Sequence, residues 1–230
     1  MIIDLKNKAR QKESGRRLVL ALGCAALCLA FPARANDKLD AGGLSFRDFA
    51  KVDNGASFAR RDPMIAGGPN QIPSRIIGID NNRGVVRVRL EQIRVTVDLP
   101  QGWEATEDWE RGVAYSSDKR YRLIVWRVDF EFEGVKDAEH YAATKAGAIK
   151  ARRPNVKAEA RRLDDRAFLV VFENVPKAGG DDEARVVFDL IMPQPGNPKF
   201  GVLVTLGVPA SDAGRGLNLL ALIMKSIRID

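Results

Sequence analysis

The sequence is poor in the residues that build reactive and metal-binding sites, since its 230 residues include two cysteines and one histidine. Both cysteines, Cys24 and Cys28, lie in an apolar stretch near the start of the chain. The rest of the sequence therefore has no thiol for a disulfide, a thiolate metal site or a cysteine nucleophile. The single histidine, His140, cannot form a histidine-rich metal site by itself. We therefore expect no metal and no cofactor.

The first 35 residues have the layout of a secretory signal peptide. A basic segment at residues 1–17 precedes an apolar run at residues 18–31, and Ala33-Arg34-Ala35 supplies a small-x-small cleavage site. The run is shorter than the roughly 20 apolar residues that a membrane-spanning helix needs. We expect cleavage after Ala35 and a periplasmic or secreted protein without a transmembrane span in its mature form. Sec and twin-arginine export both fit this segment.

The charge balance argues against a nucleic-acid partner. The chain has 37 Lys and Arg against 30 Asp and Glu, a formal net charge of +7. The leader contains seven of the basic and two of the acidic residues, so 30 basic and 28 acidic residues remain after cleavage, a net charge of +2. Proteins that bind nucleic acid through its phosphates have a marked basic excess. We therefore expect no nucleic-acid partner.

The composition divides the exported part of the chain into two stretches. Residues 36–74 are rich in Gly, Asp, Asn and Arg and show no sustained hydrophobic period, which predicts a loosely ordered N-terminal arm. Residues 75–230 are sufficient for one domain with a single core. We expect that domain to be α+β.

Period-two hydrophobic patterns predict a series of strands. Apolar runs on either side of residues 81–84 predict a hairpin. Alternation of apolar and polar residues predicts a strand at 93–99, and a short strand at 113–116 leads into the longest one, 121–132. Four more strands are predicted as an antiparallel meander, at residues 156–163, 166–174, 184–192 and 199–208.

Two helices complete the predicted domain. Asp137 is placed to cap an alanine-rich helix that ends before Pro154, and Ser211 or Asp212 begins a terminal helix that runs to about Lys225. An antiparallel sheet with segregated helices is the α+β class. We predict an antiparallel sheet of about six or seven strands flanked by helices, an α-β-α sandwich.

The terminal helix is apolar over more than half of its circumference, whereas a helix that lies on a sheet needs a stripe of little more than 100°. The arm or the hairpin is expected to cover the excess. The alternative is a structural assembly factor that docks on a neighbouring protein through this C-terminal helix.

Basic residues gather at the corner between the alanine-rich helix and the next strand. Six of them, which we call the basic corner, fall within 13 residues: Lys150, Arg152, Arg153, Lys157, Arg161 and Arg162. Such a cluster predicts an anionic partner, either an envelope protein or an anionic lipid or glycan. The alternative is a solvated face that Asp164 and Asp165 partly neutralise.

Two patterns allow a hydrolase as an alternative function. Asp129 and Glu131 share one face of the longest predicted strand, and paired carboxylates can hydrolyse glycans. Ser117 lies within a Ser-x-x-Lys pattern, residues 116–119, although that chemistry requires a helix and this pattern falls in a predicted turn. An acid catalyst also needs an apolar pocket, whereas the end of this strand is polar.

Three features together resemble the PsbP-like fold over residues 93–230. They are an amphipathic strand closed by Leu99-Pro100-Gln101-Gly102-Trp103, a helix at 137–152 after a long hydrophobic strand, and a final helix that leads into Lys225-Ser226-Ile227-Arg228. Photosystem II extrinsic proteins, Ran-binding nuclear import factors and many exported bacterial proteins of unknown function share this α-β-α sandwich. The resemblance implies a non-enzymatic domain that binds proteins or ligands, and it assigns no site residue.

From these observations we expect an exported, non-catalytic binding or accessory protein of the bacterial cell envelope that recognises a protein or an anionic envelope component. The envelope hydrolase with Asp129, Glu131 or Ser117 and the assembly factor that docks through its C-terminal helix are the alternatives. The sequence predicts no oligomeric state.

Overall fold

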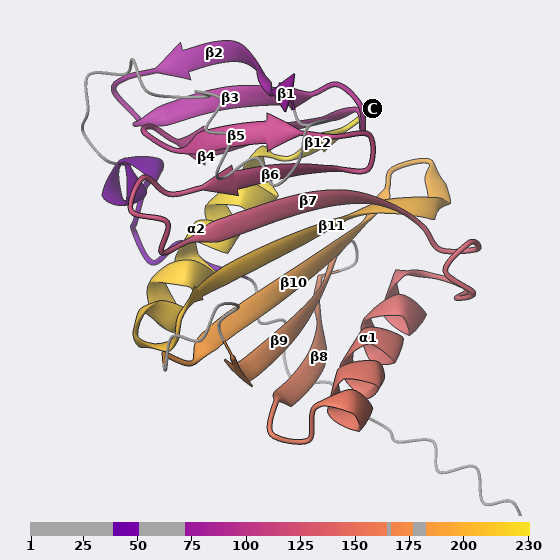
Figure 1. The fold of residues 1–230 in the computed structure, drawn as a ribbon. Coiled ribbons are helices and arrows are strands. Elements are labelled where there is room, and N and C mark those ends of the chain that lie inside the picture. Colours follow the sequence, from indigo (N-terminus) through magenta and orange to yellow (C-terminus); the bar gives the residue numbers. More distant parts are fainter. Residues whose placement is uncertain (1–38, 51–71, 165–166, 177–182) are drawn as a thin grey trace, which may run out of the picture. The chain divides into compact units, whose positions relative to one another are not determined.

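The computed structural model describes residues 39–50, 72–164, 167–176 and 183–230, and the predicted signal peptide lies outside them. These residues form two antiparallel sheets and two α-helices, which confirms the predicted α+β class with a sheet flanked by helices (Figure 1). The larger sheet has eight strands in the spatial order β1 (Ile72–Pro73), β5 (Glu104–Glu107), β6 (Arg111–Tyr115), β7 (Arg122–Asp129), β11 (Asn197–Pro209), β10 (Arg185–Gln194), β9 (Ala167–Val175) and β8 (Lys157–Asp164). The smaller sheet has four, in the order β12 (Arg228–Ile229), β4 (Val95–Pro100), β3 (Val85–Leu90) and β2 (Arg75–Asp80).

The strand pairing agrees with the predicted meander and hairpin but divides the strands between two sheets. β8, β9, β10 and β11 are consecutive neighbours, and β7 pairs with the far side of β11. The hairpin β2–β3 and strand β4 pair with one another instead of joining the larger sheet. The chain passes from β4 to β5 through a turn in which Gly102 has a φ of 80°, a conformation that glycine adopts without strain. The sequence pattern shows which residues face a core, but it does not show which strands pair.

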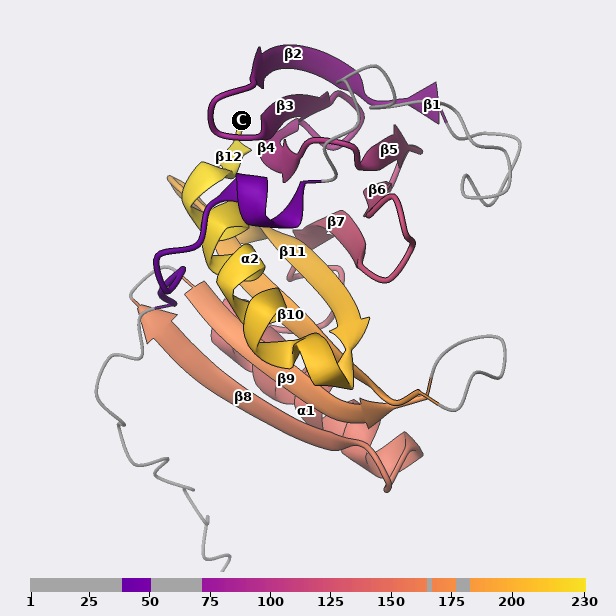
Figure 2. The same cartoon turned by 90° about the vertical axis from the view of Figure 1, so that its left-hand side faces the viewer.

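The two helices lie on opposite faces of the larger sheet (Figure 2). Helix α1 (Ala138–Arg152) begins at the predicted cap, where the Asp137 carboxylate accepts a hydrogen bond from the His140 N–H at 2.8 Å. Alternation along β10 divides its side chains between the two faces. Ile191 belongs to the apolar cluster under α1, whereas Phe188 and Leu190 belong to the cluster that includes α2 (Ala213–Ser226).

Helix α2 is covered from within the chain. It packs on β10 and β11 of the larger sheet and on β4 of the smaller one, and it also contacts the short 3₁₀ helix η1 (Phe46–Phe49). Leu219, Leu220 and Ile223 are fully buried. The assembly-factor alternative depended on the apolar surface of α2, and other parts of the same chain pack on that surface. Among the described residues, no helix is both long and apolar enough to cross a membrane.

Residues 39–50 fall within the predicted arm, and here they pack on the domain. Leu39 and Phe46 are buried in the larger core, and the Trp103 indole N–H donates a hydrogen bond to the Phe49 carbonyl at 3.3 Å. The Arg215 guanidinium of α2 donates to the Asp48 carbonyl at 2.8 Å. The remainder of the predicted arm up to residue 71 lies outside the described residues.

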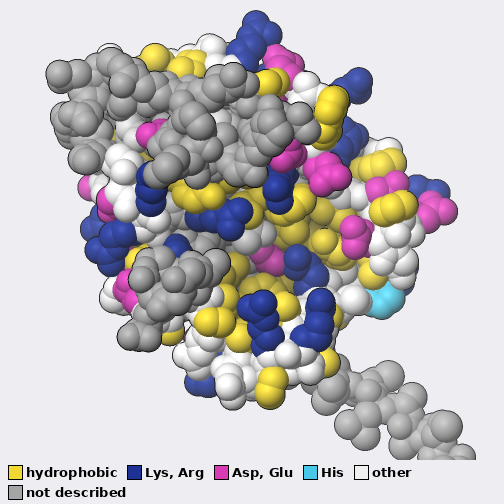
Figure 3. Space-filling model, viewed as in Figure 1, with side chains coloured by type: hydrophobic (Ala, Val, Ile, Leu, Met, Phe, Trp, Pro, Cys, Tyr) yellow, Lys and Arg dark blue, Asp and Glu magenta, His cyan; other side chains and the backbone are white. Residues whose placement is uncertain are grey.

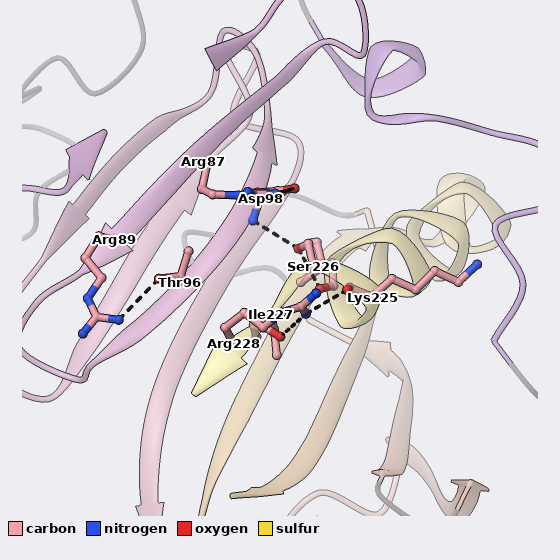
Figure 4. Close-up of polar contacts among 9 residues, drawn as sticks. Arg87, Arg89, Thr96, Asp98, Lys225, Ser226, Ile227 and Arg228 are labelled. Atoms are coloured by element: carbon pink, nitrogen blue, oxygen red, sulfur yellow. Dashed lines mark hydrogen bonds and ion pairs between the residues drawn. The ribbon is translucent and has the colours of Figure 1, made fainter. Parts of the chain in front are cut away.

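A polar lock joins the end of α2 to the smaller sheet (Figure 4). The Asp98 carboxylate, 2 % exposed, accepts two hydrogen bonds from the Arg87 guanidinium, at 2.6 and 2.9 Å. The backbone N–H of Asp98 donates to the Ser226 hydroxyl at 3.1 Å, and that hydroxyl donates to the Ile223 carbonyl at 2.9 Å. Because one residue bonds both Arg87 and Ser226, the helix end has a defined position on β4.

Replacing Gly216 by alanine should destabilise the protein, although alanine is the better helix former by about 1 kcal/mol. An added Cβ would lie 2.9 Å from both methyls of Val208 and 3.2 Å from the Phe188 ring, between α2 and the sheet. We expect Gly216→Ala to lower the free energy of unfolding in urea by about 1–3 kcal/mol.

The control is Gly147→Ala in α1, where an added Cβ meets nothing within 4 Å. This variant should be more stable than the wild type by up to about 1 kcal/mol. Equal effects of the two substitutions would show that α2 does not pack closely on the larger sheet.

Candidate binding groove

Helix α1 covers only part of its face of the larger sheet. It packs on β8, β9 and β10, and a groove of about 620 Å³ lies between the helix and the sheet, with β7 and β11 contributing to its floor. Binding sites for small molecules have volumes of roughly 300–1,000 Å³. Hydrophobic side chains gather on this face of the molecule, with Lys and Arg side chains around them (Figure 3). We call this feature the α1 groove.

Strand alternation forms the floor of the groove. Every second residue of a strand faces the same way, so β7 contributes Ile124, Trp126 and Val128, and β11 contributes Leu203 and Thr205. In the antiparallel register Leu203 lies opposite Trp126, and Thr205 lies opposite Ile124. The same register places Thr205 opposite Asp189 of β10. The floor is therefore an apolar surface with a polar pair on one side.

The wall of the groove is the inward face of α1. Ala138, Ala142 and Ala146 are buried against the sheet, and these small side chains let the helix approach it closely. Tyr141 and Lys145 follow the same helical stripe at spacings of three and four residues. Lys145 is thus a charged residue on the buried side of a helix.

The central polar contact of the groove is an ion pair between α1 and β10. The Lys145 ammonium lies 3.0 Å from a carboxylate oxygen of Asp189, which is 3 % exposed. The other carboxylate oxygen accepts a hydrogen bond from the Thr205 hydroxyl at 2.6 Å. A buried carboxylate is tolerated only when it is paired and hydrogen-bonded, and Asp189 is both. The pair therefore fixes α1 over β10.

Tyr141 adds a neutral polar group beside this pair. Its ring packs on Phe130, with the centroids 5.7 Å apart, and the Lys145 ammonium lies 5.4 Å from its centroid. Burial, together with the negative charges of Glu133 and Asp189, raises the pKa of the Tyr141 phenol to about 12. The phenol therefore stays uncharged at any physiological pH.

Basic side chains stand on the rim of the groove. Arg152 and Arg153 are exposed where α1 ends, whereas strand alternation directs the Arg127 side chain of β7 to the other face of the sheet, where it donates to Gln194 at 3.3 Å. Within the described part of the chain, neither Arg152 nor Arg153 forms an ion pair, and the Arg152 side chain donates to the Ala148 carbonyl at 3.2 Å. Glu133 lies at the other end, before the start of α1. The rim is therefore basic at one end of the groove and acidic at the other.

The structure divides the basic corner between two hollows. Arg152 and Arg153 line the α1 groove. Lys150, Lys157 and Arg161 instead line a second hollow of about 630 Å³, which includes Phe188 and Leu217 from the α2 side, together with Glu159 and Glu173. Arg162 lies over the Phe168 ring at 5.7 Å. The six residues do not line one site, because Arg152 and Arg153 lie at the end of α1, whereas alternation along β8 directs Lys157 and Arg161 to the other face of the sheet.

The candidate hydrolase residues lie outside both hollows. The prediction of a strand to residue 132 is wrong, since β7 ends at Asp129, whose carboxylate accepts the Phe132 N–H at 3.1 Å and so starts a turn. Glu131 is exposed and pairs with Lys199 at 3.1 Å. Ser117 lies in the turn before β7. Because Glu131 lies beyond the strand end, the predicted alternation of carboxylates on one strand face does not form.

No candidate metal site is found among the described residues. They contain no group of three or more His, Cys, Asp and Glu side chains that could hold an ion. His140 is exposed, and its Nδ1 accepts the Lys136 N–H at 3.4 Å.

Sequence reasoning missed Lys145 and Asp189, although each has a detectable signal. Asp189 is the one charged residue in the apolar run from residue 186 to residue 192. Lys145 occupies an inward position of the helical stripe that Ala138 and Tyr141 define. Opposite charges at the buried positions of two neighbouring elements indicate a pair, but only the fold shows that these two elements touch.

Comparison with known proteins supports the fold alone. No family model matches the sequence, and no curated protein matches it. Among solved structures, the chain is similar to the Ran-binding protein Mog1p of Saccharomyces cerevisiae, with 13 % identity, a TM-score of 0.44 and coverage of 63 % of this chain and 95 % of that one. It is also similar to the PsbP of the cyanobacterium Synechocystis, with 12 % identity, a TM-score of 0.46 and coverage of 74 % and 100 %. The resemblance to the PsbP-like fold is thereby confirmed as a likeness of structure.

Replacing Lys145 by methionine should destabilise the protein, because it leaves the Asp189 carboxylate buried without its cation. We expect Lys145→Met to lower the free energy of unfolding at pH 7 by about 3 kcal/mol. Urea unfolding at pH 7 measures this loss.

Two variants complete this test. Lys150→Met, at an exposed position of the same helix, should change stability by no more than about 0.5 kcal/mol. The double variant Lys145→Met/Asp189→Leu should recover most of the loss, since it removes the buried carboxylate together with its cation. A single variant as stable as wild type at pH 7 would contradict a structural role for the pair.

Proposed function

We propose that this chain is an exported, non-catalytic binding protein of the bacterial cell envelope, and that the α1 groove is its binding site. The observation that carries the proposal is the composition of the groove, an apolar floor with a basic end. Ligand sites are concave and mostly apolar, with a few placed polar groups. The α1 groove has that composition.

The arrangement of the polar groups favours binding over catalysis. Asp189 and Thr205 are bonded to each other, and Lys145 is paired with Asp189. A general acid, base or nucleophile must have an atom available to the substrate. In this groove the buried polar atoms instead hold the wall against the floor.

The charges at the open end favour an anionic partner. Arg152 and Arg153 place two exposed guanidinium groups where α1 ends, and Lys150 and Lys157 of the basic corner lie nearby in the sequence. Guanidinium groups bind carboxylates and phosphates with two parallel hydrogen bonds. We therefore propose that Arg152 and Arg153 hold the anionic part of the partner.

Export rests on the predicted leader. We expect the mature protein in the envelope fraction to begin at Asn36, and mass spectrometry of the purified protein measures its N-terminus. Replacing both Ala33 and Ala35 by arginine should leave the precursor uncut, because the cleavage site requires small residues at these positions. A mature protein that retains residues 1–35 would contradict the proposed leader.

Site-specific photocrosslinking in living cells tests the groove as the binding site. A benzoylphenylalanine at Thr144, which lines the groove, should yield adducts in the envelope, whereas the same group at Ala143, exposed on another side of α1, should not. Ala148→Trp, which places a bulky side chain in the groove, should abolish the Thr144 adducts. Equal adducts from Thr144 and Ala143, or adducts that Ala148→Trp leaves unchanged, would contradict the proposal.

A further inference from the structure

We infer that the α1 groove binds one fatty-acid anion, with its acyl chain along the floor and its carboxylate at Arg152 and Arg153. This inference rests on the proposed function of the groove as a binding site. It is carried by three observations: the apolar floor, the pairing of the internal polar groups, and the charge difference between the two ends.

The length and lining of the groove suit a single chain. Its wall runs along α1 from Tyr141 to Arg152, a length of about 16 Å at the rise of an α-helix. Ile124, Leu203 and Val187 lie on the floor beneath this wall. Each methylene buried on such a surface should raise affinity about fourfold. A linear chain gains this increment along the whole length of the groove.

The groove does not suit an extended peptide. Its floor is the face of a sheet, where the backbone N–H and C=O groups are already paired between strands. The buried side chains Asp189 and Thr205 are bonded to each other. A peptide backbone buried here would find few hydrogen-bond partners, and unpaired backbone groups are costly. An acyl chain has no such groups.

The charges at the two ends give the ligand one orientation. Arg152 and Arg153 stand where α1 ends, whereas Glu133 lies before its start. A carboxylate is attracted to the first end and repelled from the second. Between the two ends, the Lys145 ammonium is 3.0 Å from the Asp189 carboxylate, so the middle of the groove has little net charge to compete for the head group. The methyl end of the chain is therefore expected near Val128 and Val135.

Quenching of tryptophan fluorescence by a brominated fatty acid tests this inference. Trp126 lies on the groove floor, and Trp109 is 74 % exposed and outside the groove. Because bromine quenches tryptophan fluorescence on contact, brominated dodecanoate should lower the fluorescence of the mature wild-type protein in a saturable way. Trp126→Phe should lose this saturable quenching, and Trp109→Phe should retain it. In Ala148→Trp, unlabelled dodecanoate should no longer compete with the brominated acid.

A series of fatty acids of increasing length and a set of arginine and lysine variants define the chemistry of the ligand. Affinity should rise about fourfold per methylene from octanoate until the groove is filled. The double variant Arg152→Gln/Arg153→Gln should weaken dodecanoate binding about tenfold, and binding of dodecanol, which has the same chain, should change less than twofold. The double variant Lys157→Gln/Arg161→Gln, in the second hollow, should leave dodecanoate binding within twofold.

The inference would be overturned by quenching that persists in Trp126→Phe, by an affinity that does not depend on chain length, or by the absence of saturation. A protein adduct from Thr144 in the crosslinking experiment, together with no binding of dodecanoate, would overturn the fatty-acid inference and leave the proposed binding site intact. The absence of both would remove the binding site as well.

Discussion

The ion pair between Lys145 and Asp189 determines where α1 lies, and the groove exists because of that position. Both charges occupy inward positions, one on a helix and one on a strand, where each would be costly without the other. Because the pair joins α1 to β10, the helix covers β8, β9 and β10, and the floor contributed by β7 and β11 stays open. A purely apolar contact could shift by one ridge of side chains, whereas an ion pair with a buried carboxylate fixes the position of its cation.

The two faces of the larger sheet differ in how they are covered, and this difference locates the site. On one face, α2 is enclosed by the larger sheet, the smaller sheet and η1, and its end is held by the lock between Asp98 and Ser226. On the other face, α1 lies on the sheet without a second layer among the described residues. The hollow on the side of the enclosed helix is lined by charged residues of β8 and β9, whereas the single helix on the wide sheet leaves an apolar groove along its side. The binding surface is therefore a consequence of the architecture.

Much of the fold could be predicted from local patterns, and the site could not. The alternation that defines β4, the apolar runs that define β9 and β10, and the cap at Asp137 depend on neighbouring residues, so the sequence shows them directly. The division into two sheets and the contact of Lys145 with Asp189 depend on which distant segments pair, and periodicity carries no such information. The basic corner illustrates the same limit. Its members are close in sequence, but Arg152 and Lys157 line different hollows, because α1 covers one face of the sheet and the Lys157 side chain of β8 points to the other.

The most direct test of this account is methyl-resolved NMR of the mature protein during titration with dodecanoate. The account predicts saturable shift changes at the methyls of Ile124, Val187 and Leu203, on the α1 side of the sheet, and none at Leu190 and Leu206 in the core on the α2 side. The exposed isoleucines of β2, Ile77 and Ile79, are the competing apolar surface. Changes centred on β2 or on the α2 side, with the groove methyls unmoved, would contradict the account.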